Sequence, residues 1–192
     1  MSITFRNEIY RKSFHLCSLS MPVGFYVIGN ETTVVIIFIT LIIAAYIDLS
    51  RLFNFPGWKY IEKPFKPMIR DHEHSTMSGA FYILLAGLIA GLLLETPYAA
   101  AVMGFVVLGD ITAALIGRRF GRIRLPGTNK TLEGTIGCLT ACIFVAIVIP
   151  GLPLFIGIIG AFTASLAEAY SWKFDDNLSI VIISGAIMHL LA

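Results

Sequence analysis

Long apolar stretches recur along the whole chain of 192 residues and constrain its fold more than any other feature. A bilayer core needs about 20 helical residues, and somewhat fewer where flanking side chains snorkel. Inside lipid the backbone must pair its own polar groups, which a helix does within one segment. We therefore predict an all-α, polytopic integral membrane protein of about seven transmembrane helices, with spans at residues 13–29, 33–49, 77–94, 97–117, 134–149, 151–168 and 178–191.

Composition agrees with a membrane protein. Hydrophobic residues make up 57% of the chain and charged residues only 14%, whereas about a quarter of a soluble domain is charged. The formal net charge of +2 in so apolar a chain excludes nucleic acid as an expected partner and leaves the membrane lipids. The length suits one unit, so residues 1–192 are expected to form a single transmembrane domain.

The basic residues indicate the orientation of this bundle. All 14 Lys and Arg side chains fall into four groups, in the connections before span one, after span two, after span four and after span six. Alternating spans bring the four groups to one face, and cytoplasmic loops are the ones that accumulate Lys and Arg. The N-terminus is therefore expected to be cytoplasmic. Spans five and six could instead form one re-entrant hairpin with its tip at residues 150–153.

Asp110 is the first sign of chemistry, because it lies in the apolar part of span four. An ionised carboxylate is costly in the bilayer and indicates function by default. Asp110, Ala114, Gly117 and Gly121 share one helix face, which leaves room for a ligand or another backbone beside the carboxylate. The alternative is helix packing through small residues, with Asp110 held only in an ion pair.

A loop rich in Gly and basic residues follows span four and ends at Lys130. Basic side chains, backbone N–H groups and a helix N-terminus together suit a polyphosphate. Mg²⁺ bound to such a ligand would need a carboxylate such as Asp110 or Glu133. The spacing differs from the Walker A pattern. The alternative is an ordinary cytoplasmic loop that only carries positive charge.

These motifs resemble a known family. The run G-D-x-x-A-x-x-x-G-R-x-x-G, followed by L-P-G-T-N-K-T-L-E-G-T, resembles the CTP-dependent polyprenol and dolichol kinases, whose relatives include phytol kinases and CTP-dependent diacylglycerol kinases. The form P-G-T-x-K-T-x-E-G-T resembles the polyprenol branch most. Shorter stretches extend the resemblance over nearly the whole chain, with E-x-x-R-K-x-x-H at 8–15, R-x-x-E at 70–73, and E-A with D-N-L at 168–178.

The resemblance implies a lipid kinase. The γ-phosphoryl group of CTP would be transferred to the hydroxyl of a long-chain lipid alcohol from the bilayer, a polyprenol such as dolichol, giving polyprenyl phosphate and CDP. Such an enzyme is a multi-pass protein of a prokaryotic plasma membrane or of the endoplasmic reticulum, with its nucleotide site on the cytoplasmic face. Mg²⁺ is the implied cofactor, and an oligomer is compatible with the sequence.

The resemblance also assigns residues. It implies Asp110, Lys130 and Glu133 as catalytic residues, and Asp110, Glu133 and Asp176 as metal ligands. Whether Asp110 or Glu133 acts as the base rather than as a Mg²⁺ ligand stays open. The implied nucleotide-binding residues are Gly117, Arg118, Gly121, Arg122, Thr131, Gly134, Arg11, Lys12, Arg70, Glu73 and Asn177.

Three alternative functions remain. A CDP-lipid synthase shares the central motif, but its C-terminal Lys-Asp pair followed by Pro-Gly-His-Gly-Gly is missing from this sequence. The same kinase chemistry could act on diacylglycerol or phytol. A small transporter could also carry an intramembrane carboxylate, although transporter sites usually lie in interrupted helices near the midplane.

Overall fold

The structure is a computed structural model that describes residues 12–13, 15–55, 58, 76–170 and 175–192. Within these residues the protein is helical and has no β-strand beyond one isolated bridge between Arg124 and Thr131. This confirms the all-α prediction. In chain order the elements are η1 (Cys17–Leu19), α2 (Ser20–Val27), α3 (Asn30–Leu52), α5 (Gly79–Leu93), α6 (Thr96–Gly104), η4 (Phe105–Gly109), α7 (Asp110–Phe120), α8 (Leu132–Val148), α9 (Leu154–Ala169) and α10 (Asp176–Leu191).

The helices follow the predicted apolar stretches. Among the described residues, Asn30–Leu52 and Thr96–Phe120 are long and apolar enough to cross a membrane by themselves. The remaining apolar helices are shorter, at Cys17–Val27, Gly79–Leu93, Leu132–Val148, Leu154–Ala169 and Asp176–Leu191. Each of the predicted spans therefore coincides with a helix, while the topology of seven crossings stays a prediction.

Local sequence explains where several helices begin. The side chains of Ser78, Thr131 and Asp175 accept hydrogen bonds from backbone N–H groups of the first turns of α5, α8 and α10, which is the usual role of such residues at an N-cap. Gly29 and Gly151 have φ of +88° and +74°. Glycine adopts this left-handed backbone without steric cost, so the chain reverses sharply between α2 and α3 and between α8 and α9.

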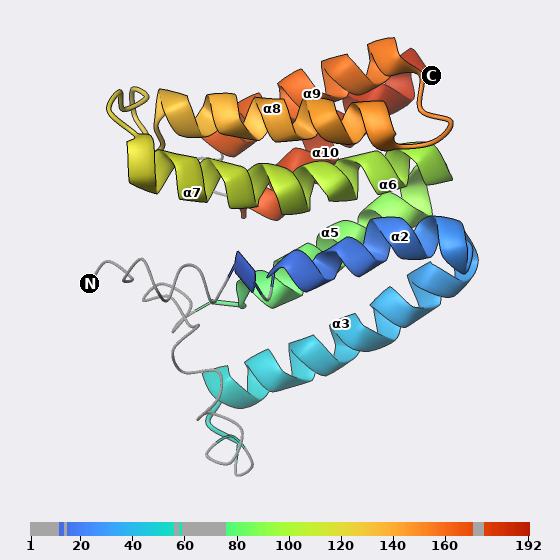
Figure 1. Ribbon diagram of the computed structural model, residues 1–192. Helices are drawn as coiled ribbons and strands as arrows, with labels where there is room; N and C mark the ends of the chain where they lie inside the picture. The colour runs from blue at the N-terminus through green and yellow to red at the C-terminus, as the bar shows by residue number, and fades with distance from the viewer. Residues whose placement is uncertain (1–11, 14, 56–57, 59–75, 171–174) are drawn as a thin grey trace.

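A continuous helix through the middle of the molecule organises the packing. It consists of α6, η4 and α7, and its residues Ala99–Val107 are fully shielded from solvent. On one side α8, α9 and α10 pack in sequence, and on the other α2, α3 and α5 pack together (Figure 1). Large apolar side chains of α3 stay exposed, among them Val35, Ile36, Phe38, Ile39, Ile42 and Ile43. An apolar surface of this kind suits contact with lipid.

The connections sort into two ends of the bundle. The α7–α8 loop and the C-terminal end of α3 lie at the left end in Figure 1, and the α2–α3 and α8–α9 turns lie at the right end. The left end therefore carries Arg51 and the basic residues of the α7–α8 loop. Alternation of the spans predicts such a distribution, while the number of crossings and the cytoplasmic face stay predictions.

Candidate functional site

A cavity of about 440 Å³ opens at the end of the bundle that carries the α7–α8 loop. Its wall on α7 and α8 is formed by small residues, including Ala113, Ala114, Gly117 and Gly134. The other side chains that face it are mainly charged, namely Lys12, Asp110, Arg118, Lys130, Glu168 and Asp176. The cavity thus combines a narrow backbone-lined wall with both signs of charge.

Asp110 lies at the first residue of α7, directly after the π-helical turn η4. Such turns are rare and occur frequently at functional sites. The Asp110 carboxylate forms an ion pair with the Lys12 ammonium, and its Oδ2 lies 3.4 Å from Nε2 of His15. Lys12 is buried, so the segment before η1 contributes a charged group to the inside of the site.

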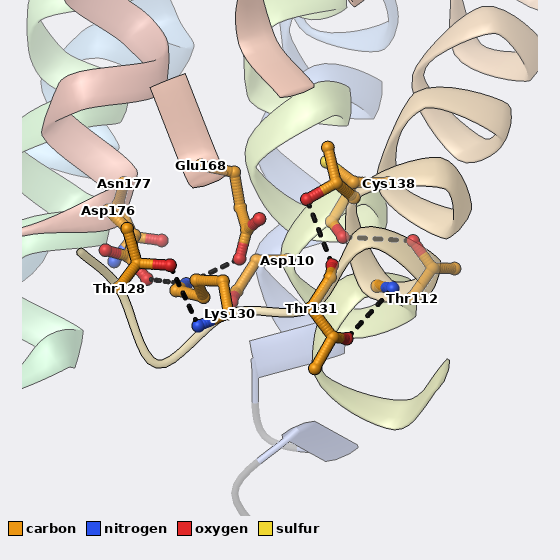
Figure 2. A network of polar contacts seen from close by, with 12 residues as sticks. Asp110, Thr112, Thr128, Lys130, Thr131, Cys138, Glu168, Asp176 and Asn177 are labelled. Atoms are coloured by element: carbon orange, nitrogen blue, oxygen red, sulfur yellow. Dashed lines mark hydrogen bonds and ion pairs between the residues drawn. The ribbon is translucent and has the colours of Figure 1, made fainter. Parts of the chain in front are cut away.

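Lys130 lies at the end of the α7–α8 loop, opposite two carboxylates. Its Nζ lies 2.5 Å from Oε1 of Glu168 and 2.7 Å from Oδ2 of Asp176, as Figure 2 shows. Burial favours the neutral amine, but the charges of Asp176 and Glu168 outweigh it and raise the pKa of Lys130 above its usual value. The two carboxylates therefore favour the protonated form of Lys130.

Three carboxylates meet at this point from three helices. Asp110 begins α7, Glu168 lies near the end of α9 and Asp176 begins α10. One oxygen from each lies within 4.8 Å of the others. Hard divalent cations such as Mg²⁺ prefer carboxylate oxygens, so the chemistry of this donor set fits the implied cofactor.

Asn177 adds a polar atom beside this cluster. Its side chain is buried, and its Nδ2 donates a hydrogen bond to Oδ1 of Asp175 at 2.7 Å. Its Oδ1 is also buried and has no hydrogen-bond partner among the described residues. A buried acceptor without a partner is costly, and the neighbouring Asp176 lines the cavity. Asn177 itself is not among the residues that line the cavity, so its predicted contact with the nucleotide stays a prediction.

The N-terminus of α8 forms one wall of the cavity. Thr131, Gly134 and Thr135 line it, and Oγ1 of Thr131 accepts a hydrogen bond from the Gly134 N–H at 3.2 Å. The positive end of a helix dipole and its N–H groups favour an anionic ligand. This arrangement agrees with the prediction that Thr131 and Gly134 lie at a phosphate site.

The predicted glycines have a clear packing role. A Cβ on Gly134 would lie 2.9 Å from the carbonyl oxygen of Ala113 and 3.3 Å from Cα of Gly117, and one on Gly121 would lie 2.7 Å from Cγ2 of Thr131 at the N-cap of α8. The glycines therefore let α7 and α8 approach closely. Gly117 and Gly134 also line the cavity, whereas Gly121 is absent from its wall.

Glu133 lies apart from the carboxylate cluster, contrary to its predicted place among the metal ligands. Both of its carboxylate oxygens accept from the backbone N–H of Ile123 at 3.3 Å. Thr131 and Gly134 face the cavity, and successive residues of a helix are rotated by about 100°, so Glu133 turns toward the α7–α8 loop. The structure places Glu168 where Glu133 was expected.

The remaining predicted residues differ in their position relative to the cavity. Arg118 lines the cavity and Arg122 does not. Arg11, Arg70 and Glu73 lie outside the described residues. Sequence reasoning did not select Glu168, although the motif at 168–178 contains it and a buried carboxylate in an apolar helix was an available signal.

Comparison with known proteins gives related kinases. The chain is 27% identical to the CTP-dependent diacylglycerol kinase 1 of Schizosaccharomyces pombe, and the match covers 97% of this chain and 94% of that protein. It is 27% identical to the dolichol kinase of Homo sapiens over 88% of this chain and 36% of that protein. Its identity to the dolichol kinase of Saccharomyces cerevisiae is 35%, over 54% of this chain and 20% of that protein.

Two other comparisons found nothing similar. No family model matches the chain, and no solved structure matches it. The assignment to a family therefore rests on these relatives and on the motifs that contribute Asp110, Lys130 and Asp176 to the cavity. These relatives support the CTP-dependent polyprenol and dolichol kinase family that the sequence motifs indicate.

Proposed function

We propose that the protein is a CTP-dependent lipid kinase whose active site is the cavity at the α7–α8 loop. The observation that carries this proposal is the meeting of Lys130 with Asp110, Glu168 and Asp176 in one cavity. Phosphoryl transfer depends mainly on positioning and on neutralising the phosphate charge. An ammonium, a helix N-terminus and a set of carboxylates for Mg²⁺ supply these needs. The name of the diacylglycerol kinase relative, and a match that covers 94% of that protein, support CTP as the donor.

In the proposed reaction the lipid hydroxyl oxygen forms a bond to the γ-phosphorus of CTP. The bond from that phosphorus to the β–γ bridging oxygen breaks, CDP leaves, and the hydroxyl proton is released. Lys130 and the N–H groups at the start of α8 would bind the phosphates, with Arg118 at the wall of the cavity. Mg²⁺, when bound, would neutralise phosphate charge, with Asp110, Glu168 and Asp176 as its protein ligands.

Asp110 has two proposed roles. It could hold Mg²⁺, or it could accept the proton of the lipid hydroxyl at a carboxylate oxygen. Its place supports either role, because it lies where the polar cavity meets the buried helical core formed by η4. The lipid hydroxyl would reach Asp110 laterally from the bilayer. We propose a multi-pass protein with its nucleotide site on the cytoplasmic face, supported by the basic residues at this end of the bundle.

A polyprenol such as dolichol is the first proposed acceptor, and the support is the form of the motif that ends at Thr135. Diacylglycerol is the second. It is favoured by the extent of the match to the diacylglycerol kinase, because dolichol kinases match this chain over 36% or less of their own length.

A substrate panel tests the proposal. Purified protein in detergent with Mg²⁺ is given γ-labelled CTP or ATP and either a polyprenol, phytol or diacylglycerol. Labelled lipid phosphate formed with CTP is expected, and the labelled product identifies the acceptor. Release of pyrophosphate from CTP when a lipid phosphate is supplied, without labelled lipid, would show a CDP-lipid synthase instead.

A further inference from the structure

The Lys130 ammonium occupies part of the carboxylate cluster that is proposed to hold the divalent cation. Nζ of Lys130 lies 2.5 Å from Glu168 Oε1 and 2.7 Å from Asp176 Oδ2, and the same two residues join Asp110 in the three-carboxylate group. Figure 2 shows the lysine side chain directed to both acids. A cation of the protein itself therefore already pairs with two of the three carboxylates.

A lysine ammonium and a divalent cation compete for these oxygens. Mg²⁺ binds carboxylate oxygens at about 2.0–2.1 Å, so an ammonium hydrogen-bonded to the same oxygens would lie a few ångströms from it. Two cations at such a separation repel strongly in a partly buried site. The metal therefore binds more favourably once the lysine has left the carboxylates.

Lys130 can leave, whereas Glu168 cannot. The Lys130 side chain is 32% exposed and that of Glu168 only 2%. Lys130 carries its charge on a flexible four-carbon stem and lines the cavity, so it can turn toward a ligand there. Glu168 is held near the end of α9 and needs a cation beside its buried carboxylate, because an unpaired buried charge is costly.

We propose that Lys130 is a resident counter-ion, which the divalent cation displaces from Glu168 and Asp176 when nucleotide binds. The released ammonium then binds the phosphates of the same nucleotide. This inference rests on the proposed function and deepens it by specifying an exchange. It makes the binding of metal and nucleotide cooperative. The metal frees Lys130 to bind the phosphates, and the phosphates hold the freed Lys130 away from the carboxylates that the metal needs. Metal without nucleotide competes with Lys130 and binds weakly.

Mn²⁺ binding without nucleotide tests the exchange. The free Mn²⁺ signal in electron paramagnetic resonance is measured with the purified full-length protein and with Lys130→Met. Arg124→Met is the matched control, because it removes one cation from the same loop outside the cavity wall. Lys130→Met is expected to bind Mn²⁺ about tenfold or more tightly than the unchanged protein, and Arg124→Met within about twofold. Equal affinity of the two variants would overturn the proposal.

A second variant locates the effect. Lys130→Met combined with Glu168→Gln keeps the shape of the buried side chain but removes its charge, so the gain in Mn²⁺ affinity is expected to disappear. A gain that survives in the double variant would contradict exchange at Glu168. If Lys130→Met is poorly folded, Lys130→Gln serves in its place. Thermal unfolding with and without Mn²⁺ then provides a second readout, since a ligand that binds only the native state raises its melting temperature.

These outcomes separate the exchange from the proposed function. Mn²⁺ binding is measured without nucleotide, lipid or turnover. Labelled lipid formed by a protein whose Lys130→Met variant gains no Mn²⁺ affinity would refute the exchange alone. A gain in Mn²⁺ affinity without any labelled lipid would support the competition between Lys130 and the metal and refute the kinase.

Discussion

Lys12 and Asp110 are 98 residues apart in the sequence and form an ion pair inside the cavity. Lys12 is buried, and the Asp110 side chain is 14% exposed. The pair joins the segment before η1 to the start of α7, directly after the π-helical turn. It thereby links the N-terminal motif of the sequence to the central motif.

Replacing one member of this pair should destabilise the fold. Lys12→Met leaves the Asp110 carboxylate without its main cation, at an expected cost of about 3 kcal/mol. We expect a lower midpoint of thermal unfolding and little lipid phosphorylation. The double variant with Asp110→Asn should recover much of the stability but none of the activity. If Lys12→Met unfolds at the same temperature as the unchanged protein, the ion pair contributes no stability.

Replacement by glutamine should affect lipid phosphorylation very differently at two glutamates, Glu168 and Glu133. Glu168→Gln removes a charge from the carboxylate cluster and is expected to lower lipid phosphorylation about a hundredfold or more. Glu133→Gln removes a charge outside the carboxylate cluster, on a side chain that accepts from the Ile123 N–H, so a loss of a few fold is expected. Rates are measured at saturating CTP. Equal losses would contradict the placement of Glu133 outside the cluster.

The close approach of α7 and α8 gives a prediction about stability. Gly134→Ala would press its Cβ against the carbonyl oxygen of Ala113, and relief of this clash is expected to cost about 1–3 kcal/mol. Gly185→Ala is the control, because its nearest neighbour at 3.1 Å is the end of the flexible Leu94 side chain. Thermal unfolding in detergent should show the larger loss for Gly134→Ala. The reverse order would contradict the packing described here.

The pH dependence of stability should change when Asp175 is neutralised. Burial, together with the neighbouring Asp176 carboxylate, outweighs the lowering effect of hydrogen bonds from Asn177 and raises the pKa of Asp175 from 3.8 to about 6. The folded state therefore holds this proton more tightly than the unfolded state does. Its contribution to stability is full below about pH 4 and is lost as the pH rises toward 6.

Asp175→Asn removes this titration and keeps an acceptor oxygen for the Asn177 N–H at the start of α10. The melting temperature of the variant minus that of the unchanged protein should therefore be larger at pH 7.5 than at pH 4.5. Asp176→Asn, which alters the neighbouring acid, should also lower the pKa of Asp175. A difference that does not vary with pH would show that Asp175 ionises as it does in the unfolded chain.

Much of the fold was predictable because the apolar stretches determine it. The predicted spans coincide with helices, and the predicted turn at residues 150–153 contains Gly151 in its left-handed conformation. Asp110 and Lys130 could be selected for a related reason. A carboxylate within an apolar helix and a lysine at the start of the next one are visible in the sequence without any knowledge of distant contacts.

The partners of these residues could not be predicted in the same way. Lys130 pairs with Glu168 across 38 residues and with Asp176 across 46, and such pairs depend on how three helices pack. Glu133 was selected because it follows Lys130 closely in the motif. Its orientation depends on the rotation of α8 and on the Ile123 N–H, neither of which a motif records. The π-helical turn before Asp110 likewise has no simple sequence pattern.

The most direct test of the account is the transfer of label from γ-labelled CTP to a lipid alcohol by the unchanged protein, Lys130→Met and Arg124→Met. The unchanged protein and Arg124→Met should form labelled lipid phosphate at similar rates with CTP. Lys130→Met should lose about a hundredfold or more. Full activity of Lys130→Met would contradict a phosphate site at this cavity, and label transfer from neither CTP nor ATP to any lipid would contradict the kinase itself.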